Sequence, residues 1–483
     1  MCRLVLALLL VAGCRPKASP ERIVTLLATA EIHGTPEPCG CQSDPLGDVA
    51  RIGGLFQQAQ RRGPALLVDA GGLRRTNQPI PEAAEAQAQL KAHFLERTFR
   101  DLGAVLGDDL VQPEVRTIDG LKIGLLRLGA APAPVVAGLR SQGADLIVAL
   151  AQVDRATARQ IARSTPGISI LVVGKEVGEG GAPEQLGETL IVQPAEEGQR
   201  IVRIVLHMAN GTLSTRLVAS ETDRARERAR TQQKIAVLDN EIAQLEKDPT
   251  AEPAFVATKR RQRAELAAAL AAPTPTPSGS YAIAELMPIR HTLPRDPQIA
   301  AAMKVLDAAV GEANRTAGEK MAVPAAAPGA AHYVGLEQCE LCHDEAVNFW
   351  KTTVHARAWN ELVQVNKQWS FDCIGCHITG YGQRGGSAMA HVDGLTDVQC
   401  EVCHGPGSQH VERPQKMRLK MPSDNDCKSC HTKDHSDTFQ YAPYLRDVLG
   451  PGHGEKRRTA LGEGPTGHEL RHAAQQKAGG HSL

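Results

Sequence analysis

Residues 339–343 read Cys339-Glu-Leu-Cys342-His343, and the same Cys-x-x-Cys-His pattern returns at residues 373–377, 400–404 and 427–431. The spacing has a chemical reason: two thiols three positions apart can bond to the two vinyl groups of one haem, and the adjacent imidazole then reaches the iron. Paired Cys with His can also bind zinc, but a His directly after every second Cys favours haem. The pattern therefore predicts a C-terminal region organised around four haem c groups.

The attachment thiols and proximal ligands follow from the four units. The predicted attachment residues are Cys339, Cys342, Cys373, Cys376, Cys400, Cys403, Cys427 and Cys430. The predicted proximal iron ligands are His343, His377, His404 and His431. Each iron has a sixth position, for which the other His of this region are the candidates.

The first fourteen residues, MCRLVLALLLVAGC, read as a signal peptide with one basic residue and an apolar run too short to span a bilayer. The end of this run resembles a bacterial lipobox, which predicts cleavage before Cys14 and acylation of its thiol. An ordinary cleaved signal peptide is the alternative. We therefore expect a bacterial cell-envelope protein that is lipid-anchored to the membrane and faces the periplasm or the outer membrane.

Basic and acidic residues both number 54, so the formal net charge is zero. This balance argues against nucleic acid as a partner. The expected partners are redox proteins.

Residues 21–220 alternate short β-branched runs with helical patterns, which predicts an α/β domain with buried strands. Asp119-Gly120 and Asn210-Gly211 are typical of hairpin turns, so the sheets are expected to be mixed.

The amino-acid composition of the remaining chain changes from segment to segment. Residues 221–272 carry apolar residues spaced three and four apart, which predicts a helical hairpin or coiled coil. Its role is a spacer or, alternatively, a site for a helical partner. Residues 273–331 are rich in Pro and Ala and predict a linker region. Residues 332–455 form the predicted haem domain, and residues 456–483 a flexible tail.

Residues 336–453 resemble the tetrahaem cytochrome c of ammonia oxidisers, which accepts electrons from hydroxylamine oxidoreductase. The matching strings are WKTTVHARA around His355, CIGCHITGYGQRGG from Cys373 and QCEVCHGPGSQHV from Gln399. The resemblance implies a mostly α-helical domain. It also implies that His355 is the distal ligand of the fourth haem, His410 of the first and His453 of the third, with His435 as the competitor of His453 for that role.

In that family the second haem has no protein sixth ligand, which implies an open iron at His377. His391 has no counterpart in the family pattern and is the residue that would close the site. Four closed haems would form an electron wire, whereas an open iron would bind a small ligand. The leading hypothesis is therefore an electron carrier, and the alternative is a haem oxidoreductase that acts on a small nitrogen or oxygen species.

The N-terminal strings TAEIHG, DVARIGG and LLVDAGG resemble the metallophosphoesterase domain of the 5′-nucleotidase family. Two-metal hydrolysis needs a cluster of carboxylates and imidazoles. His33 is retained, but Glu31, Gly72, Gln152 and Lys175 stand where the family has metal ligands. The resemblance thus implies a metallophosphoesterase-like sandwich that has lost its site, and phosphoester hydrolysis is the weakest of the three functions.

Glu37-Pro38-Cys39-Gly40-Cys41 follows His33 closely and resembles an insertion in a subgroup of nucleotidase-like proteins. Cys39, Cys41 and His33 are candidates for binding a soft metal, which would be an additional metal of the N-terminal domain, or for redox exchange. A packing or disulfide role for the two Cys is the alternative.

Overall fold

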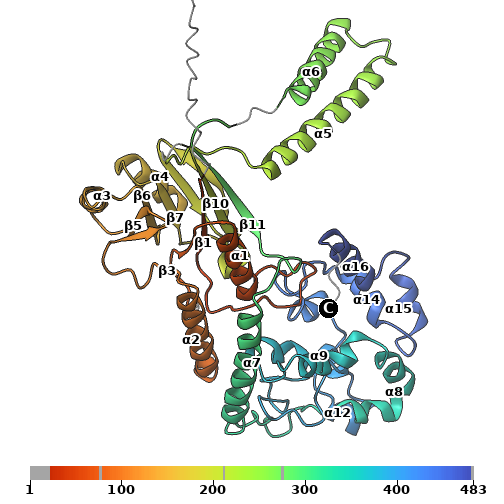
Figure 1. The fold of residues 1–483 in the computed structure, drawn as a ribbon. Coiled ribbons are helices and arrows are strands. Elements are labelled where there is room, and N and C mark those ends of the chain that lie inside the picture. Colours follow the sequence, from red (N-terminus) through yellow and green to blue (C-terminus); the bar gives the residue numbers. More distant parts are fainter. Residues whose placement is uncertain (1–21, 75–78, 210–212, 274–276, 480–483) are drawn as a thin grey trace, which may run out of the picture.

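The computed structural model describes residues 22–74, 79–209, 213–273 and 277–479. Cys14 and Asn210-Gly211 therefore lie outside the described residues. An α/β body carries a helical hairpin that projects from one end, and a helical C-terminal region packs beside its other end (Figure 1). Among the described helices, none is long and apolar enough to cross a membrane.

Two mixed sheets form the α/β body. The first has the strand order β11-β10-β1-β2-β3 and the second β4-β5-β6-β7-β9-β8. The strands of the first are β1 (Arg22–Thr29), β2 (Ala65–Asp69), β3 (Val105–Leu106), β10 (Arg200–Met208) and β11 (Tyr281–Pro288). Those of the second are β4 (Glu114–Ile118), β5 (Leu121–Arg127), β6 (Leu146–Ala151), β7 (Ile170–Val173), β8 (Gly181–Leu186) and β9 (Thr189–Gln193). The predicted turn at Asp119-Gly120 joins antiparallel β4 and β5, and both of its residues have a positive φ.

Helices cover the outer faces of both sheets. Helices α1 (Val49–Arg62), α2 (Glu85–Asp101) and α7 (Pro297–Gly318) contribute to one apolar cluster with the first sheet, and α3 (Pro132–Ser141) and α4 (Arg155–Ser164) to another with the second. A third cluster fills the space between the sheets. The short 3₁₀ helices are η1 (Glu82–Ala84), η2 (Glu196–Gly198) and η3 (Val354–Arg357). The predicted α/β sandwich is confirmed.

Part of the predicted linker belongs to this sandwich. Within residues 273–331, β11 pairs with β10 over eight register partners, and α7 packs against α1 and α2. Asp296 starts α7, because its carboxylate accepts hydrogen bonds from the backbone N–H groups of Gln298 and Ile299. Gly54 of α1 allows the close approach, since a Cβ there would lie 2.3 Å from the carbonyl oxygen of Pro294. The Pro/Ala composition predicts a linker, but the partners of these elements lie far away in the sequence.

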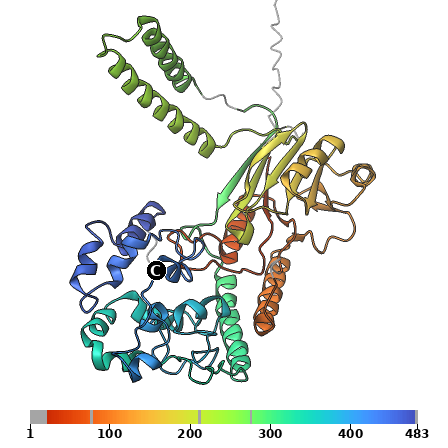
Figure 2. The ribbon, with the colours of Figure 1, turned by 180° about the vertical axis from the view of Figure 1, so that it is seen from behind.

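The segment between β10 and β11 holds the projecting hairpin of α5 (Glu221–Leu245) and α6 (Pro253–Ala271), which stands clear of the body in both views (Figures 1 and 2). Neither helix contains a buried residue. Ion pairs join the two helices, including Lys259 to Glu241 at 2.9 Å and Arg263 to Asp239 at 2.9 Å.

The C-terminal region consists of short helices around a small apolar cluster of Ile374, Ile378, Met389 and Val392. The helices are α8 (Leu336–Trp350), α9 (Ala358–Gln364), α10 (Phe371–His377), α11 (Cys400–His404), α12 (Ser408–Glu412), α13 (Asp424–Lys428), α14 (Tyr441–Val448), α15 (Glu455–Ala460) and α16 (Gly467–Lys477). Residues 456–483, predicted as a flexible tail, contribute most of α15 and all of α16, and α16 packs against α14. The predicted helical C-terminal region is confirmed.

Because α5 and α6 bury nothing against the body, we expect that replacing residues 221–271 with a flexible Gly/Ser linker of about eight residues leaves the fold intact. The thermal midpoint and the haem content, measured by calorimetry and absorbance, should equal those of the full chain. Leu27→Ala is the control, since truncating this fully buried side chain should cost about 2–5 kcal/mol. A shortened chain that loses haem or melts earlier would contradict this expectation.

Candidate functional site

All four Cys-x-x-Cys-His units open into one cavity of about 3010 Å³. A pocket for a single small ligand has about 300–1,000 Å³, so this cavity has room for several large groups. Every Cys of the four units lines the cavity as a free thiol, and every motif His lines it too. The donor set, with two thiols and one imidazole at each of four places, fits covalently bound haem.

The first unit faces a second imidazole from α12. The ring centroids of His343 and His410 lie 6.3 Å apart, and the ring planes are 23° from parallel. Metal–imidazole nitrogen bonds of about 2.0–2.1 Å on both sides of one metal atom require a separation of this size. The Nδ1 atom of His410 lies 2.6 Å from the carbonyl oxygen of Met417, an arrangement that leaves Nε2 to face the cavity.

The fourth unit has the same arrangement with a residue of η3. The ring centroids of His355 and His431 lie 6.2 Å apart. Burial lowers the pKa of His355 and lowers that of His431 to about 4, so both rings are neutral and keep a lone pair for a metal. The Nδ1 atom of His431 lies 3.1 Å from the hydroxyl of Ser436, which orients the ring.

The third unit lies near His453. Burial lowers the pKa of His453, and the charge of the neighbouring His404 lowers it further. The Nδ1 atom of His453 is buried and has no hydrogen-bond partner in the described chain, whereas the Nδ1 atom of His435 lies 2.8 Å from the Thr432 hydroxyl. The structure thus places His453 near enough to His404 for their charges to interact, and the choice between His453 and His435 as a ligand of the third iron stays a prediction.

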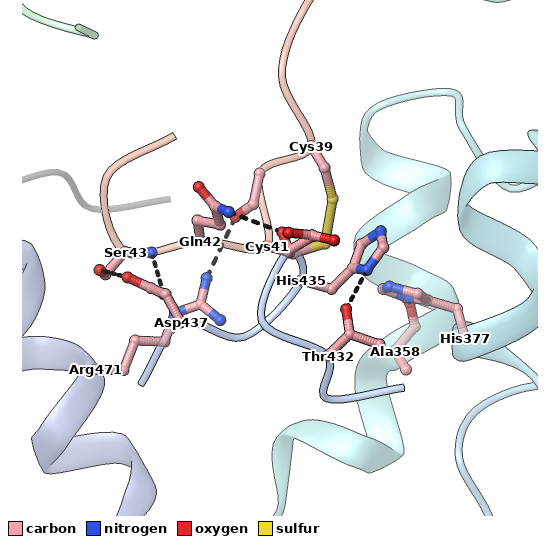
Figure 3. The surroundings of a disulfide bond; sticks show 12 residues. Cys39, Cys41, Gln42, Ser43, Ala358, His377, Thr432, His435, Asp437 and Arg471 are labelled. Atoms are coloured by element: carbon pink, nitrogen blue, oxygen red, sulfur yellow. Dashed lines mark hydrogen bonds between the residues drawn. A yellow bond between two sulfur atoms is a disulfide. The ribbon is translucent and has the colours of Figure 1, made fainter. Parts of the chain in front are cut away.

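The second unit differs from the other three. His377 is oriented by a 2.6 Å contact between its Nδ1 atom and the carbonyl oxygen of Ala358. His391, the residue that the sequence offers for the sixth position, is described but is not among the residues that line the cavity. His435 lines the cavity and is drawn with His377 around the Cys39–Cys41 pair in Figure 3.

The units also meet each other, which the sequence does not predict. The thiols of Cys339 and Cys400 lie close enough to each other to interact, and so do those of Cys376 and Cys430. The first and third units are therefore neighbours, and so are the second and fourth. The order of the units along the sequence does not predict these pairs, because neither pair joins consecutive units.

The end of β1 carries the residues that the nucleotidase resemblance singles out. Glu31 and His33 form an ion pair with 2.5 Å between Oε2 and Nε2, and this contact is the main reason that the pKa of His33 is raised. A Cβ at Gly72 would lie 2.6 Å from the Glu31 carboxylate, so Glu31 occupies the space that a side chain at position 72 would need. Gln152 donates a hydrogen bond to the Ala70 carbonyl.

Lys175 is exposed and lies 3.9 Å from the carboxylate of Glu176. Within the described chain, no group of three His, Cys, Asp or Glu side chains could hold a metal ion. Of the positions where the resemblance expects metal ligands, 31 and 152 carry side chains that contact neighbouring protein groups, 72 is a glycine, and 175 is an exposed lysine.

Cys39 and Cys41 are joined to each other by a disulfide, with their Cα atoms 5.4 Å apart. His33 contacts Glu31 instead. The three residues that the sequence offers for a soft metal therefore divide into a disulfide and an ion pair. The sequence left a metal site, a redox pair and a packing or disulfide role open for Cys39 and Cys41. The structure joins them by a disulfide.

Known proteins with a similar sequence carry the same kind of site. The free thiols, the motif imidazoles and the shared cavity define a c-type cytochrome. The profile of the family described as cytochrome c554 and c-prime matches residues 338–405, which include the first three units. Cytochrome c-554 of Nitrosomonas europaea is 36% identical over 158 residues, covering 24% of this chain and 67% of the relative. The chain belongs to the cytochrome c554 family and is an electron-carrying c-type cytochrome with covalently bound haem.

Solved structures similar to the chain include a 5′-nucleotidase precursor from Thermus thermophilus, with 15% identity and a TM-score of 0.39, covering 63% of this chain and 61% of that one. The sulfate thiohydrolase SoxB of Thermus thermophilus has 11% identity and a TM-score of 0.37, with coverages of 59% and 60%. The chain spans less than two thirds of each. The first belongs to the group that the N-terminal sequence resembles.

Asp69, at the end of β2, is fully buried. Burial raises its pKa to about 7, although hydrogen bonds from Thr29 and Gly71 oppose the shift. Between about pH 4 and pH 7 the folded chain thus holds a proton that the unfolded chain has lost, so the Asp69 contribution to stability decreases as the pH rises. Asp69→Asn removes this titration.

We expect the stability of Asp69→Asn relative to the wild type to increase between about pH 5 and pH 7.5, measured as denaturation midpoints. Asp119→Asn, at an exposed turn, is the control and should show no such trend. Equal differences at both pH values for Asp69→Asn would contradict the expectation.

Proposed function

We propose that this chain is an envelope-located electron carrier with four haem c groups, three of which have two protein imidazoles on the iron. The observation that carries the proposal is the spacing of the paired rings, His343 with His410 and His355 with His431, on the wall of one cavity. His404 and His453 would hold the third. When bound, each haem supplies an iron that takes up and releases one electron.

The chain's own residues would make these haems closed to outside ligands. Two imidazoles would hold each of these irons, and contacts of Nδ1 with protein oxygens orient the rings of His404, His410 and His431. Such a centre exchanges electrons without exchanging ligands. This property suits a carrier that serves other redox proteins.

The contacts between units support a continuous path. Cys339 lies close enough to Cys400 for their thiols to interact, as does Cys376 to Cys430, and Cys403 lies near enough to Cys427 for their charges to interact. The order of neighbours is therefore first, third, fourth and second unit. The path would end at the His377 haem, on the side of the N-terminal module.

The second candidate function is a haem oxidoreductase acting on a small nitrogen or oxygen species at the His377 haem. The position of His391 outside the cavity lining favours it, because an iron without a second imidazole can bind a small ligand. Phosphoester hydrolysis is disfavoured, since Glu31 fills the space beside Gly72 where a metal-binding side chain would lie. Acylation at Cys14 would keep the carrier at the membrane surface.

To test the closed haems, we expect His355→Ala, His410→Ala and His453→Ala each to convert one haem of four from low spin to high spin. Electron paramagnetic resonance of the oxidised protein measures the spin state, and a pyridine haemochrome assay counts the haems. His332→Ala, a His outside the cavity lining, is the control and should leave the spectrum unchanged. If a variant keeps the wild-type spectrum, the His that it replaces is not an iron ligand.

To test the His377 haem, the reduced wild-type protein should bind one carbon monoxide per four haems, read from the shift of the Soret band. His391→Ala and His435→Ala should leave this stoichiometry at one. Wild-type protein that binds none, together with a His435→Ala variant that binds one, would make His435 the sixth ligand and exclude the oxidoreductase.

A further inference from the structure

The loop that carries Cys39 and Cys41 belongs to the α/β module, yet its contacts reach across to the haem region. Gln42 donates a hydrogen bond to the carbonyl oxygen of Asp434 at 3.0 Å, and the backbone N–H of Ser43 donates to Asp437 at 2.9 Å. Arg471 of α16 donates to the carbonyl oxygen of Gly40, between the two Cys, at 3.3 Å. Figure 3 shows the disulfide within this network.

These contacts come from segments next to particular haem units. Asp434 and Asp437 follow His431 of the fourth unit by three and six residues, and Lys367, six residues before Cys373 of the second unit, forms an ion pair with Glu37. The second and fourth units are neighbours through Cys376 and Cys430. The disulfide loop is thus docked at the end of the path where these two units meet, and both its Cys line the same cavity.

The surroundings of the sulfur atoms suit a reactive disulfide. Cys39 is exposed and Cys41 is half-buried, so protons can reach both from water. The guanidinium of Arg471 beside Gly40 favours the thiolate form that thiol–disulfide chemistry requires. A bond that spans a single residue closes a very short loop, so it adds little chain-entropy stabilisation to the fold.

We propose that Cys39 and Cys41 form a two-electron redox site that exchanges electrons with the haems of the second and fourth units. The inference rests on the proposed four-haem function. In the reducing direction the S–S bond breaks, the two sulfur atoms accept one electron from each of two ferrous irons and two protons from water, and two thiols and two ferric irons result. In the oxidising direction the same two electrons and two protons leave, and the bond forms again. The carrier thereby gains a link between one-electron transfer and two-electron thiol chemistry.

The test counts electrons on the full-length holoprotein at an electrode. The wild type should take up six electrons per chain, four on the haems and two on the disulfide, against four for the Cys39→Ser/Cys41→Ser variant. Alkylation with N-ethylmaleimide and peptide mass spectrometry should find two new thiols, at positions 39 and 41, only in the reduced wild type. Equal electron uptake by the two proteins would overturn the proposal.

The haem number is read separately, by the pyridine haemochrome assay on both proteins. A lower haem count would refute the four-haem function but would leave the difference of two electrons as the test of the disulfide. The two failures are therefore distinguishable.

The route through the interface is tested by Lys367→Ala/Asp437→Ala, which removes two of the contacts that dock the loop. Thiol formation should become slower than in the wild type at an unchanged rate of haem reduction. Lys351→Ala/Asp424→Ala is the matched control, since it removes the ion pairs of a Lys and an Asp elsewhere in the same region. Equal loss of rate in both variants, or in neither, would refute transfer at this contact.

Discussion

The C-terminal region depends on one constraint, the holding of covalently bound haem by pairs of thiols and imidazoles, of which four sets line a common cavity. Its own apolar cluster contains only four buried side chains among the described residues. Several of its helices have five to eight residues, a length at which an isolated helix is unstable in water. Haem faces held at eight thiols would supply the missing apolar surface. The same bonds that give the carrier its redox centres would then also give it its fold.

The α/β body is stabilised in the ordinary way, by three apolar clusters, and it joins the haem region through polar contacts. Asn314 of α7 is completely buried, and its side-chain amide donates to Gln87 of α2 and to the carbonyl oxygen of Trp369. Gln87 in turn donates to Asp372, directly before the second haem unit. Buried hydrogen bonds have narrow geometric requirements, so this chain of amides fixes the orientation of one module against the other.

How much the sequence predicts depends on the range of each interaction. The predicted haem thiols and proximal ligands follow from a five-residue pattern, and the alternation of apolar runs is enough to predict the sandwich. The prediction that His355, His410 and His453 are distal ligands rests on a family resemblance, because a lone His carries no signal of its partner. β11 and α7 escaped prediction because their pairing partners lie far away in the chain. The contacts of Cys339 with Cys400 and of Cys376 with Cys430 are long-range in the same way, and so is the docking of residues 37–43.

The loop with Cys39 and Cys41 is fixed at both ends without help from its disulfide. At its base, the backbone N–H groups of Glu31 and His33 each donate 2.8 Å hydrogen bonds, to the carbonyl oxygens of Gly71 and Gly72 respectively. At its tip, Lys367, Asp437 and Arg471 hold it against the haem region. Breaking the S–S bond removes none of these contacts. The sulfur atoms would therefore keep their position beside the second and fourth units in both oxidation states, as a reversible electron exchange requires.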